Sequence, residues 1–288
     1  PSPRNYRVDV MAKSRRTRSA ASEPAKDVVT TSDGVAALAA RFADADFLAV
    51  DTEFMREQTY YAQLCLIQIG DGTHAAAIDP LAPGIDLAPL WDLLGNERIT
   101  KVFHAAHQDL EIFFKEMGRL PLPLFDSQIA AMVLGHGDQV GYDRLVRAVL
   151  NHDIDKSSRF TDWSRRPLSA RQISYALDDV IYLAEMYPRL LAQLETKGRA
   201  GWLVDENAKM TDPATYPTEP QEAWKRLKVR NMKPTQLRRM MHLAAWRETE
   251  AQRRDLARNR ILRDETILDL AGTNPSTTAE FGKIRNFP

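Results

Sequence analysis

Two acidic residues stand two positions apart in an otherwise apolar segment. Asp51 and Glu53 lie within residues 47–54, a run that predicts a buried strand. Because side chains alternate along a strand, both carboxylates project from one face. A buried ionised pair is costly unless cations or hydrogen bonds compensate it, and divalent metal is the most direct compensation. Taken alone, the pair also fits an edge strand whose acids are solvated.

Three more residues could join this pair. Asp109 falls in the first turn of a predicted helix, where an acid can simply complement the helix dipole. Tyr175 and Asp179 are four residues apart on another predicted helix and share a face, as in an ordinary amphipathic stripe. Together, four acids can hold two cations about 3.5 to 4 Å apart for phosphodiester hydrolysis, and a tyrosine can orient the attacking water.

Short apolar runs indicate the strands that would position these groups. Residues 64–69 and 75–78, separated by Gly70-Asp-Gly72, predict a hairpin that follows the strand 47–54. Residues 99–103 predict a further strand, and Leu110 to Met117 then show helical spacing. A strand followed by a helix indicates an α/β layer.

Capping signals predict the later helices. Asp126 is expected to be an N-cap, a helix is expected from Tyr142, and Ser169 with Gln172 forms a capping box. The helix that Ser169 opens is expected to run to Gly198, with an interruption near Pro188.

The rest of the chain divides into further regions. A proline-rich stretch precedes a wholly helical segment, in which Pro234 begins a helix and Thr277 with Glu280 forms a capping box. We therefore expect a basic N-terminal arm, an α/β domain, a linker and a small helical domain. Their expected bounds are 1–29, 30–205, 206–220 and 221–288.

Composition limits the class of protein. The 288 residues, 44% hydrophobic and 27% charged, can bury one large core and a smaller one. The longest apolar runs stop far short of the roughly 20 residues that span a membrane, and no secretory signal is visible. The single cysteine, Cys65, lies in an apolar run and is expected to be a core residue, which fits a reducing cytoplasm.

Charge is balanced overall but not locally. Basic and acidic residues both total 39, whereas residues 221–262 hold twelve basic and four acidic ones. Such a stripe is either a solvated helix face or a surface that neutralises nucleic-acid phosphates without sequence preference. Trp224 and Trp246 in the same region are expected to be core residues of the helical domain rather than platforms for base stacking.

Histidines offer a different interpretation. His104, His107 and Asp109 could form a transition-metal site, and His152-Asp153 could belong to an HD-type phosphohydrolase. HD domains are all helical, whereas the region around Asp51 predicts β structure, and hard oxygen ligands favour Mg²⁺ over zinc. His104 is more simply explained as a supporting residue beside Asp109.

Three motifs resemble those of a known family. Asp51-Thr-Glu-Phe54, Phe103 to Asp109 and Tyr175-Ala-Leu-Asp-Asp179 are similar to the three motifs of the D-E-D-D exonucleases of the tyrosine-containing subclass, and within it of ribonuclease D. Residues 63–69, 125–128 and 162–168 match as well. Beyond the linker, Ala223 to Arg226 and Leu243 to Ala251 resemble the helical HRDC domain.

This resemblance implies both a fold and an activity. The fold is an RNase H-like α/β domain with a mixed central sheet flanked by helices, followed by a small all-α HRDC-type domain. The activity is 3′–5′ hydrolysis of RNA by two Mg²⁺ or Mn²⁺ ions, releasing 5′-mononucleotides. The implied catalytic residues are the metal ligands Asp51, Glu53, Asp109 and Asp179, and Tyr175 beside the nucleophilic water.

The expected partner is RNA with a free 3′ end, such as tRNA precursors and small structured RNAs, bound by a monomer. Phe54, Tyr60 and His104 are candidates for contact with the terminal nucleotide, because an aromatic ring can stack on a base or wedge beside it. Two alternatives stay open at this point. One is a DNA 3′–5′ exonuclease of the same fold, and the other is an RNA-binding adaptor without activity.

Overall fold

The computed structural model describes residues 28–155, 161–229, 231–284 and 287. The expected N-terminal arm therefore lies outside the described residues except at its end. There, Val29 forms a parallel bridge with Ile78, and its N–H donates to the carbonyl of Ala77 at 2.8 Å. The ordered domain thus begins slightly before the expected boundary at residue 30.

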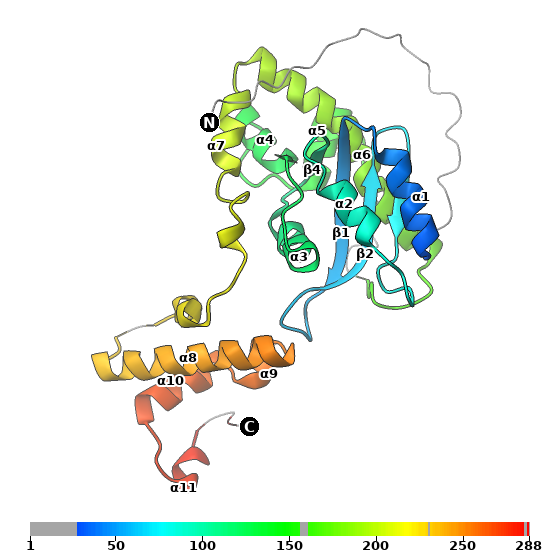
Figure 1. Cartoon of the computed structure of the whole chain (residues 1–288). Coiled ribbons are helices and arrows are strands. Elements are labelled where there is room, and N and C mark those ends of the chain that lie inside the picture. Colours follow the sequence, from blue (N-terminus) through cyan, green and yellow to red (C-terminus); the bar gives the residue numbers. More distant parts are fainter. Residues whose placement is uncertain (1–27, 156–160, 230, 285–286, 288) are drawn as a thin grey trace.

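Within the described residues, one mixed sheet has the strand order β3-β2-β1-β4-β5 (Figure 1). β1 runs antiparallel to β2 and parallel to β4. The strands are β1 (Phe47–Met55), β2 (Gln63–Gly70), β3 (Ala75–Ile78), β4 (Thr100–Phe103) and β5 (Leu124–Asp126). The predicted strands and hairpin are confirmed, and β5 is an addition.

Helices cover both faces of this sheet and form two cores. Val50 and Ile69 face α1 and α3, whereas Ala49 and Val102 face α6. The helices of this domain are α1 (Ser32–Phe42), α2 (Ala88–Leu94), α3 (His107–Met117), α4 (Ser127–Leu134), α5 (Tyr142–Leu150), α6 (Ala170–Thr196) and α7 (Ala200–Asn207). This arrangement confirms the expected α/β fold.

The helix α6 is continuous, so the interruption expected near Pro188 was wrong. Proline removes only one main-chain donor, and the helix on both sides of it is held by burial of Met186, Tyr187 and Leu190. Its start was predicted correctly, because Ser169 and Gln172 form the capping box. The continuous α6 carries residues 175–179 across the sheet.

The helical domain has a separate small core. Ala223, Met240 and Ile267 are among its buried residues, and Trp224 packs against them as expected. Trp246 is 51% exposed, so its expected core position was wrong, because it lies on the outer face of α8. The linker contains η1 (Pro213–Thr215), and the elements of the helical domain are η2 (Pro220–Arg226), α8 (Pro234–Arg254), α9 (Arg258–Ile261), α10 (Asp264–Thr273) and α11 (Thr278–Phe281).

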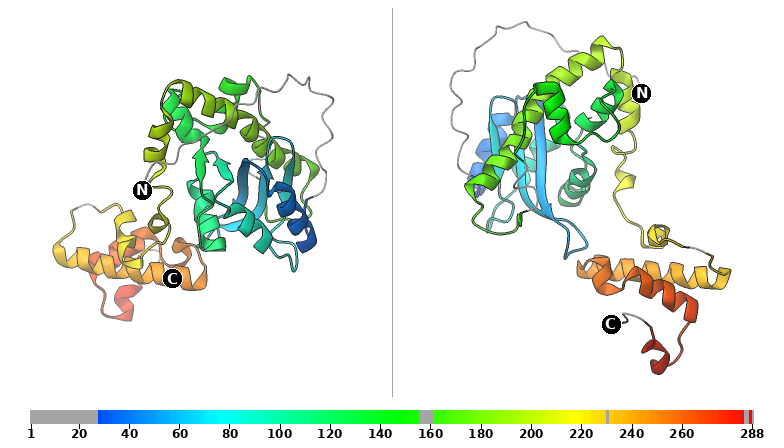
Figure 2. Two further views of the ribbon diagram at one scale, coloured as in Figure 1. Left: turned by 45° about the horizontal axis from the view of Figure 1, so that its top comes forward. Right: turned by 180° about the vertical axis from the view of Figure 1, so that it is seen from behind.

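The loop after β1 reaches the helical domain (Figures 1 and 2). The N–H groups of Tyr60 and Tyr61 donate to Asp255 Oδ1 at 3.1 and 3.0 Å. The Tyr60 hydroxyl donates to Glu248 Oε1 at 2.5 Å. Arg258 donates to both oxygens of Glu248, which is fully buried, at 2.5 and 2.7 Å. We call these five residues the interdomain contact.

Two further sequence expectations concern the single cysteine and membrane-spanning helices. Cys65 is fully buried, as predicted for a small core residue. None of the helices within the described residues combines the length and the apolarity needed to cross a membrane.

Candidate active site

The strand β1 presents two of the candidate carboxylates. Asp51 lies opposite Gln68 of β2 and Glu53 lies opposite Leu66, so both acids are on the face that α6 covers. A bulge follows at once, because Phe54 pairs with Leu64. Bulges commonly redirect a strand beside an active site, and this one ends the regular ladder directly after Glu53.

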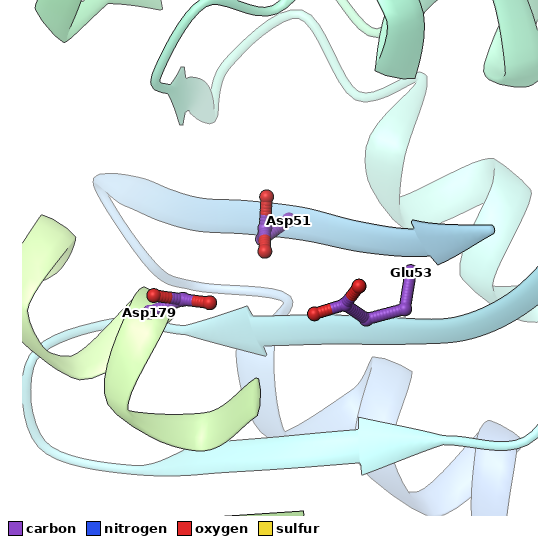
Figure 3. A group of neighbouring side chains, drawn as sticks. All are labelled: Asp51, Glu53 and Asp179. Atoms are coloured by element: carbon purple, nitrogen blue, oxygen red, sulfur yellow. The ribbon is translucent and has the colours of Figure 1, made fainter. Parts of the chain in front are cut away.

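The helix α6 supplies two further predicted residues. Tyr175 and Asp179 are one turn apart, and Asp179 is 9% exposed. One carboxylate oxygen from each of Asp51, Glu53 and Asp179 lies within 4.8 Å of the others. Figure 3 shows the three carboxylates converging on one space between β1 and α6. Three of the four expected ligands thus form a compact cluster of oxygen donors, which suits a hard divalent cation.

Asp109 lies in the same cleft but outside this compact group. It stands in the first turn of α3, is 7% exposed, and accepts a hydrogen bond from the Thr52 hydroxyl. Thr52 points to the opposite face of β1 from Asp51 and Glu53. The strand β1 therefore carries Asp51 and Glu53 on one face and holds Asp109 through Thr52 on the other, so it fixes the relative positions of these three acids.

Electrostatics at the cluster are unfavourable in the absence of cations. Burial raises the pKa of Glu53 to about 9, with added repulsion from Asp179 and Asp109. Burial also raises the pKa of Asp51 well above its ordinary value, and the same repulsion adds to it. The pKa of Asp109 rises to about 7 through burial, although the bond from Thr52 opposes the shift. These raised pKa values mean that the ionised carboxylates lack a compensating positive charge.

A cleft of about 810 Å³ opens over these groups. Its lining includes the four acids and Tyr175, together with Phe54 and His104, two of the three residues predicted to contact the terminal nucleotide. Tyr60 is not part of the lining, because its hydroxyl is held by Glu248 in the interdomain contact. The structure therefore separates Tyr60 from the other two candidates.

Trp163 and Arg166 were not identified individually as site residues from the sequence. Trp163 lines the cleft, with its ring centroid 6.2 Å from that of Tyr175. Arg166 holds this segment to the sheet by donating to both oxygens of Asp79 at 2.6 and 2.7 Å and to the Cys65 carbonyl at 2.6 Å. The only earlier signal was the family-like run 162–168, because pairing across 87 residues leaves no local pattern.

Tyr142 is another residue that the sequence left without a role. It lines the cleft, and its hydroxyl donates to the main-chain oxygen of Asp179. This bond joins the start of α5 to the turn of α6 that carries the candidate ligand. It thereby helps to fix the position of the Asp179 backbone.

The histidines do not form the alternative metal site. Nδ1 of His104 lies 2.9 Å from the Ser127 hydroxyl, and His152 Nε2 lies 2.6 Å from the Tyr182 hydroxyl. The two rings thus contact separate hydroxyl groups, and the domain is α/β rather than all helical. The interpretation as an HD-type phosphohydrolase was therefore wrong.

Some basic residues of the segment 221–262 form contacts within the protein and are not available to a nucleic acid. Arg247 is 3% exposed and donates to the Leu262 carbonyl and to Asp264, and Arg258 is engaged by Glu248. These two cations serve the helical domain and its contact with the α/β domain. The local excess of positive charge therefore overstates the charge available for a nucleic acid.

The comparisons with known proteins agree with the two-domain arrangement. A family model described as 3′–5′ exonuclease matches residues 27–195, and one described as HRDC domain matches residues 236–288. Ribonuclease D of Jannaschia sp. is 53% identical over 261 residues, covering 89% of this chain and 68% of the relative. Ribonuclease D of Zymomonas mobilis is 52% identical over 259 residues, with 90% and 66% covered. The chain thus spans about two thirds of the length of these relatives.

Comparison with solved structures also finds similarity to exonucleases. The crystal structure of Escherichia coli RNase D, described as an exoribonuclease involved in structured RNA processing, matches with a TM-score of 0.81 and 37% identity, covering 90% of this chain and 68% of that one. Brucella melitensis NrnC with bound Mg²⁺ matches with a TM-score of 0.55 and 26% identity, covering 66% and 92%. The first match includes both domains, since it extends over nine tenths of the chain.

Proposed function

Because this chain belongs to the ribonuclease D family of 3′–5′ exoribonucleases, we propose that it hydrolyses RNA from the 3′ end by a two-metal-ion mechanism and releases 5′-mononucleotides. The observation that carries the proposal is the convergence of Asp51, Glu53 and Asp179 in one cleft with Asp109. In the described part of the chain, no lysine or arginine forms an ion pair with Asp51, Glu53 or Asp109. Their charge is therefore left for cations to balance.

The donor set fits Mg²⁺ or Mn²⁺. Carboxylate oxygens are the ligands these hard cations prefer, and Asp51, Glu53, Asp109 and Asp179 would hold two of them. When bound, such ions lower the pKa of a water and stabilise the leaving 3′ oxygen. The raised pKa values of the free acids are consistent with this fit, because cations favour the ionised forms. The Mg²⁺ bound by NrnC supports the same choice of metal.

Other residues of the cleft handle the nucleotide and the water. The hydroxyl of Tyr175, one helical turn before Asp179, would orient the attacking water through a hydrogen bond. Phe54 and His104 line the cleft and would contact the terminal base and sugar. We keep Tyr60 out of this group, because it belongs to the interdomain contact.

The proposed substrates are tRNA precursors and other small structured RNAs with a free 3′ end, handled by a monomer in the cytoplasm. Support comes from the RNA-processing description of the Escherichia coli enzyme. The basic residues of the helical domain that stay exposed would neutralise phosphates along the RNA, so binding should weaken with salt.

A paired assay tests the proposal. Purified protein is incubated with a 5′-labelled single-stranded RNA, or with DNA of the same sequence, in Mg²⁺, Mn²⁺ or EDTA. Metal-dependent shortening from the 3′ end of RNA alone is expected, because the 2′-hydroxyl is a group the site can recognise. Equal shortening of DNA would favour a DNA exonuclease, and no shortening of either would favour the adaptor.

A further inference from the structure

A glutamine side chain lies fully buried in the sheet beside the proposed metal ligands. Gln68 of β2 is 0% exposed, and neither the oxygen nor the nitrogen of its amide has a hydrogen-bond partner among the described residues. Leaving a buried polar group without a hydrogen-bond partner destabilises the folded state. An apolar residue in its place would avoid that cost, so the position of Gln68 requires an explanation.

Strand pairing sets Gln68 next to Asp51. The two residues are directly opposite in the antiparallel ladder, so their side chains share a face with Cβ atoms about 4.5–5.5 Å apart. The neighbour of Gln68 on the other side is Ala77, whose methyl group offers no polar atom. Across the two ladders that flank Gln68, the carboxylate of Asp51 is therefore the adjacent hydrogen-bonding group.

The covering helix closes the space above this amide. An atom of Val180 lies 3.6 Å from the position of an added Cβ at Gly70, and Leu66 packs in one cluster with Ala176. Because Gln68 lies between Leu66 and Gly70 on the same face, it sits beneath the turn of α6 that contains Asp179. Its amide is thus enclosed by the sheet, that turn and Asp51.

A ligand carboxylate needs such a neighbour. When one oxygen of an aspartate binds a metal ion, the other oxygen is usually held by an outer hydrogen bond, which fixes the orientation of the group. A primary amide has two N–H donors and carries no charge, so it can hold a carboxylate without competing with the metal for it. A lysine at this place would neutralise Asp51 and weaken the metal site.

We propose that Gln68 is a positioning residue for Asp51, to which its side-chain amide donates a hydrogen bond when cations occupy the cleft. The inference rests on the proposed function. In this structure the three carboxylates lie close together, and the Gln68 amide has no hydrogen-bond partner within the described ranges. With cations held by the inner oxygens of the cluster, the outer oxygen of Asp51 would accept a hydrogen bond from Gln68.

Gln68→Met tests this, because methionine has a similar length and no donor. Without metal, the variant should unfold at the same or a higher denaturant concentration than the parent, since an unsatisfied amide has been removed. Its affinity for Mn²⁺, measured from the electron paramagnetic resonance signal of free Mn²⁺, should fall about 10-fold or more. A merely structural role predicts no such loss in a variant of full stability.

Matched variants separate the possible outcomes. Asn207→Leu removes another buried side chain with an unpaired oxygen, on α7 and outside the cleft lining, and should leave Mn²⁺ affinity unchanged. If Gln68→Met does not fold, Gln68→Leu repeats the test with a smaller side chain. Parent-like affinity in a folded Gln68 variant would overturn the inference. A parent protein that binds no Mn²⁺, or an Asp51→Asn variant that binds it equally well, would overturn the proposed function instead.

Discussion

Two regions of this molecule bury carboxylates, and they treat them in opposite ways. In the cleft, burial and repulsion from Asp179 raise the pKa of Glu53 to about 9. In the interdomain contact, burial alone would raise the pKa of Glu248, but hydrogen bonds from Arg258 and Tyr60 outweigh it and the pKa falls below its ordinary value. The protein itself compensates the charge of Glu248 and leaves the acids of the cleft without a compensating charge.

This difference shows how a functional acid can be told from a structural one. Glu248 is fully buried, yet its two oxygens accept from a guanidinium fork and a tyrosine hydroxyl, so nothing further can bind there. For Asp51 and Glu53, by contrast, the neighbouring charges that act on their pKa values are those of other carboxylates, which repel them. Burial alone does not distinguish the two regions, whereas the identity of the neighbours does.

Asp51→Asn removes a charge from the uncompensated region and has the largest expected effect. Hydrolysis of RNA should fall by roughly 10²–10⁴-fold, because a ligand that holds the cations is lost. The metal-free variant should be at least as stable as the parent, since repulsion is relieved. Single-turnover rates and denaturant unfolding in EDTA measure the two effects. Full activity in metal-stripped preparations would contradict the proposed site.

Arg258→Ala removes the cation that compensates Glu248 in the interdomain contact. Glu248 then remains buried without its cation, so the free energy of unfolding should fall by about 3–5 kcal/mol. Arg253→Ala is the matched control, because Arg253 is 66% exposed at its ion pair with Glu250 and its removal should leave the stability nearly unchanged. Equal small losses in both variants would show that the interdomain contact is no stronger than a surface pair.

Tyr60→Phe removes one donor from the same contact and should have a smaller effect. The hydrogen bond to an ionised Glu248 is expected to contribute about 1.5–3 kcal/mol to stability. Denaturant unfolding measures the loss, and a double mutant with Arg258→Ala tests whether the two donors act as a unit. Loss of RNA affinity with unchanged stability would instead restore Tyr60 to the substrate-binding group.

The last test uses pH in the absence of metal. Glu53 has a folded pKa of about 9 against 4.5 for the ordinary group, so the folded state binds the extra proton between these values. The free energy of unfolding should therefore fall as pH rises through this window, by up to about 1.4 kcal/mol per pH unit. Parent and Glu53→Gln are compared in EDTA from pH 5 to 9. If the stability of both proteins changed with pH in the same way, the pKa of Glu53 in the folded protein would not be raised.

Local patterns explain why much of the fold could be predicted. Strand alternation in residues 47–54 and the capping box at Ser169 are set by near neighbours, so both elements appear where expected. The three-residue β5 has too few positions for a periodic signal. The path of α6 through Pro188 depends on packing against the core, which the sequence around Pro188 does not reveal.

The acids of the candidate site could be predicted from the sequence, but the contacts that hold the site in place could not. The types and spacing of the acids, with the family resemblance, identify the carboxylates that the structure gathers in one cleft. Pairings between distant segments could not be found, because neither Arg166 with Asp79 nor Tyr60 with Glu248 leaves a local trace. Tyr60 was therefore predicted as a candidate base contact, whereas the structure places it in the interdomain contact and outside the cleft lining.

The interdomain contact also orders events during protein synthesis. The loop that binds Glu248 continues directly from β1, and its residues Arg56 and Glu57 line the cleft. Tyr60 and Glu248 are 188 residues apart, so at about 5–20 residues per second the partner leaves the ribosome roughly 10–40 s later. In this interval the sheet can form with its acids while this wall of the cleft is unsupported. A nascent chain can thus anchor this loop to Glu248 and Arg258 only after α8 and α9 have emerged.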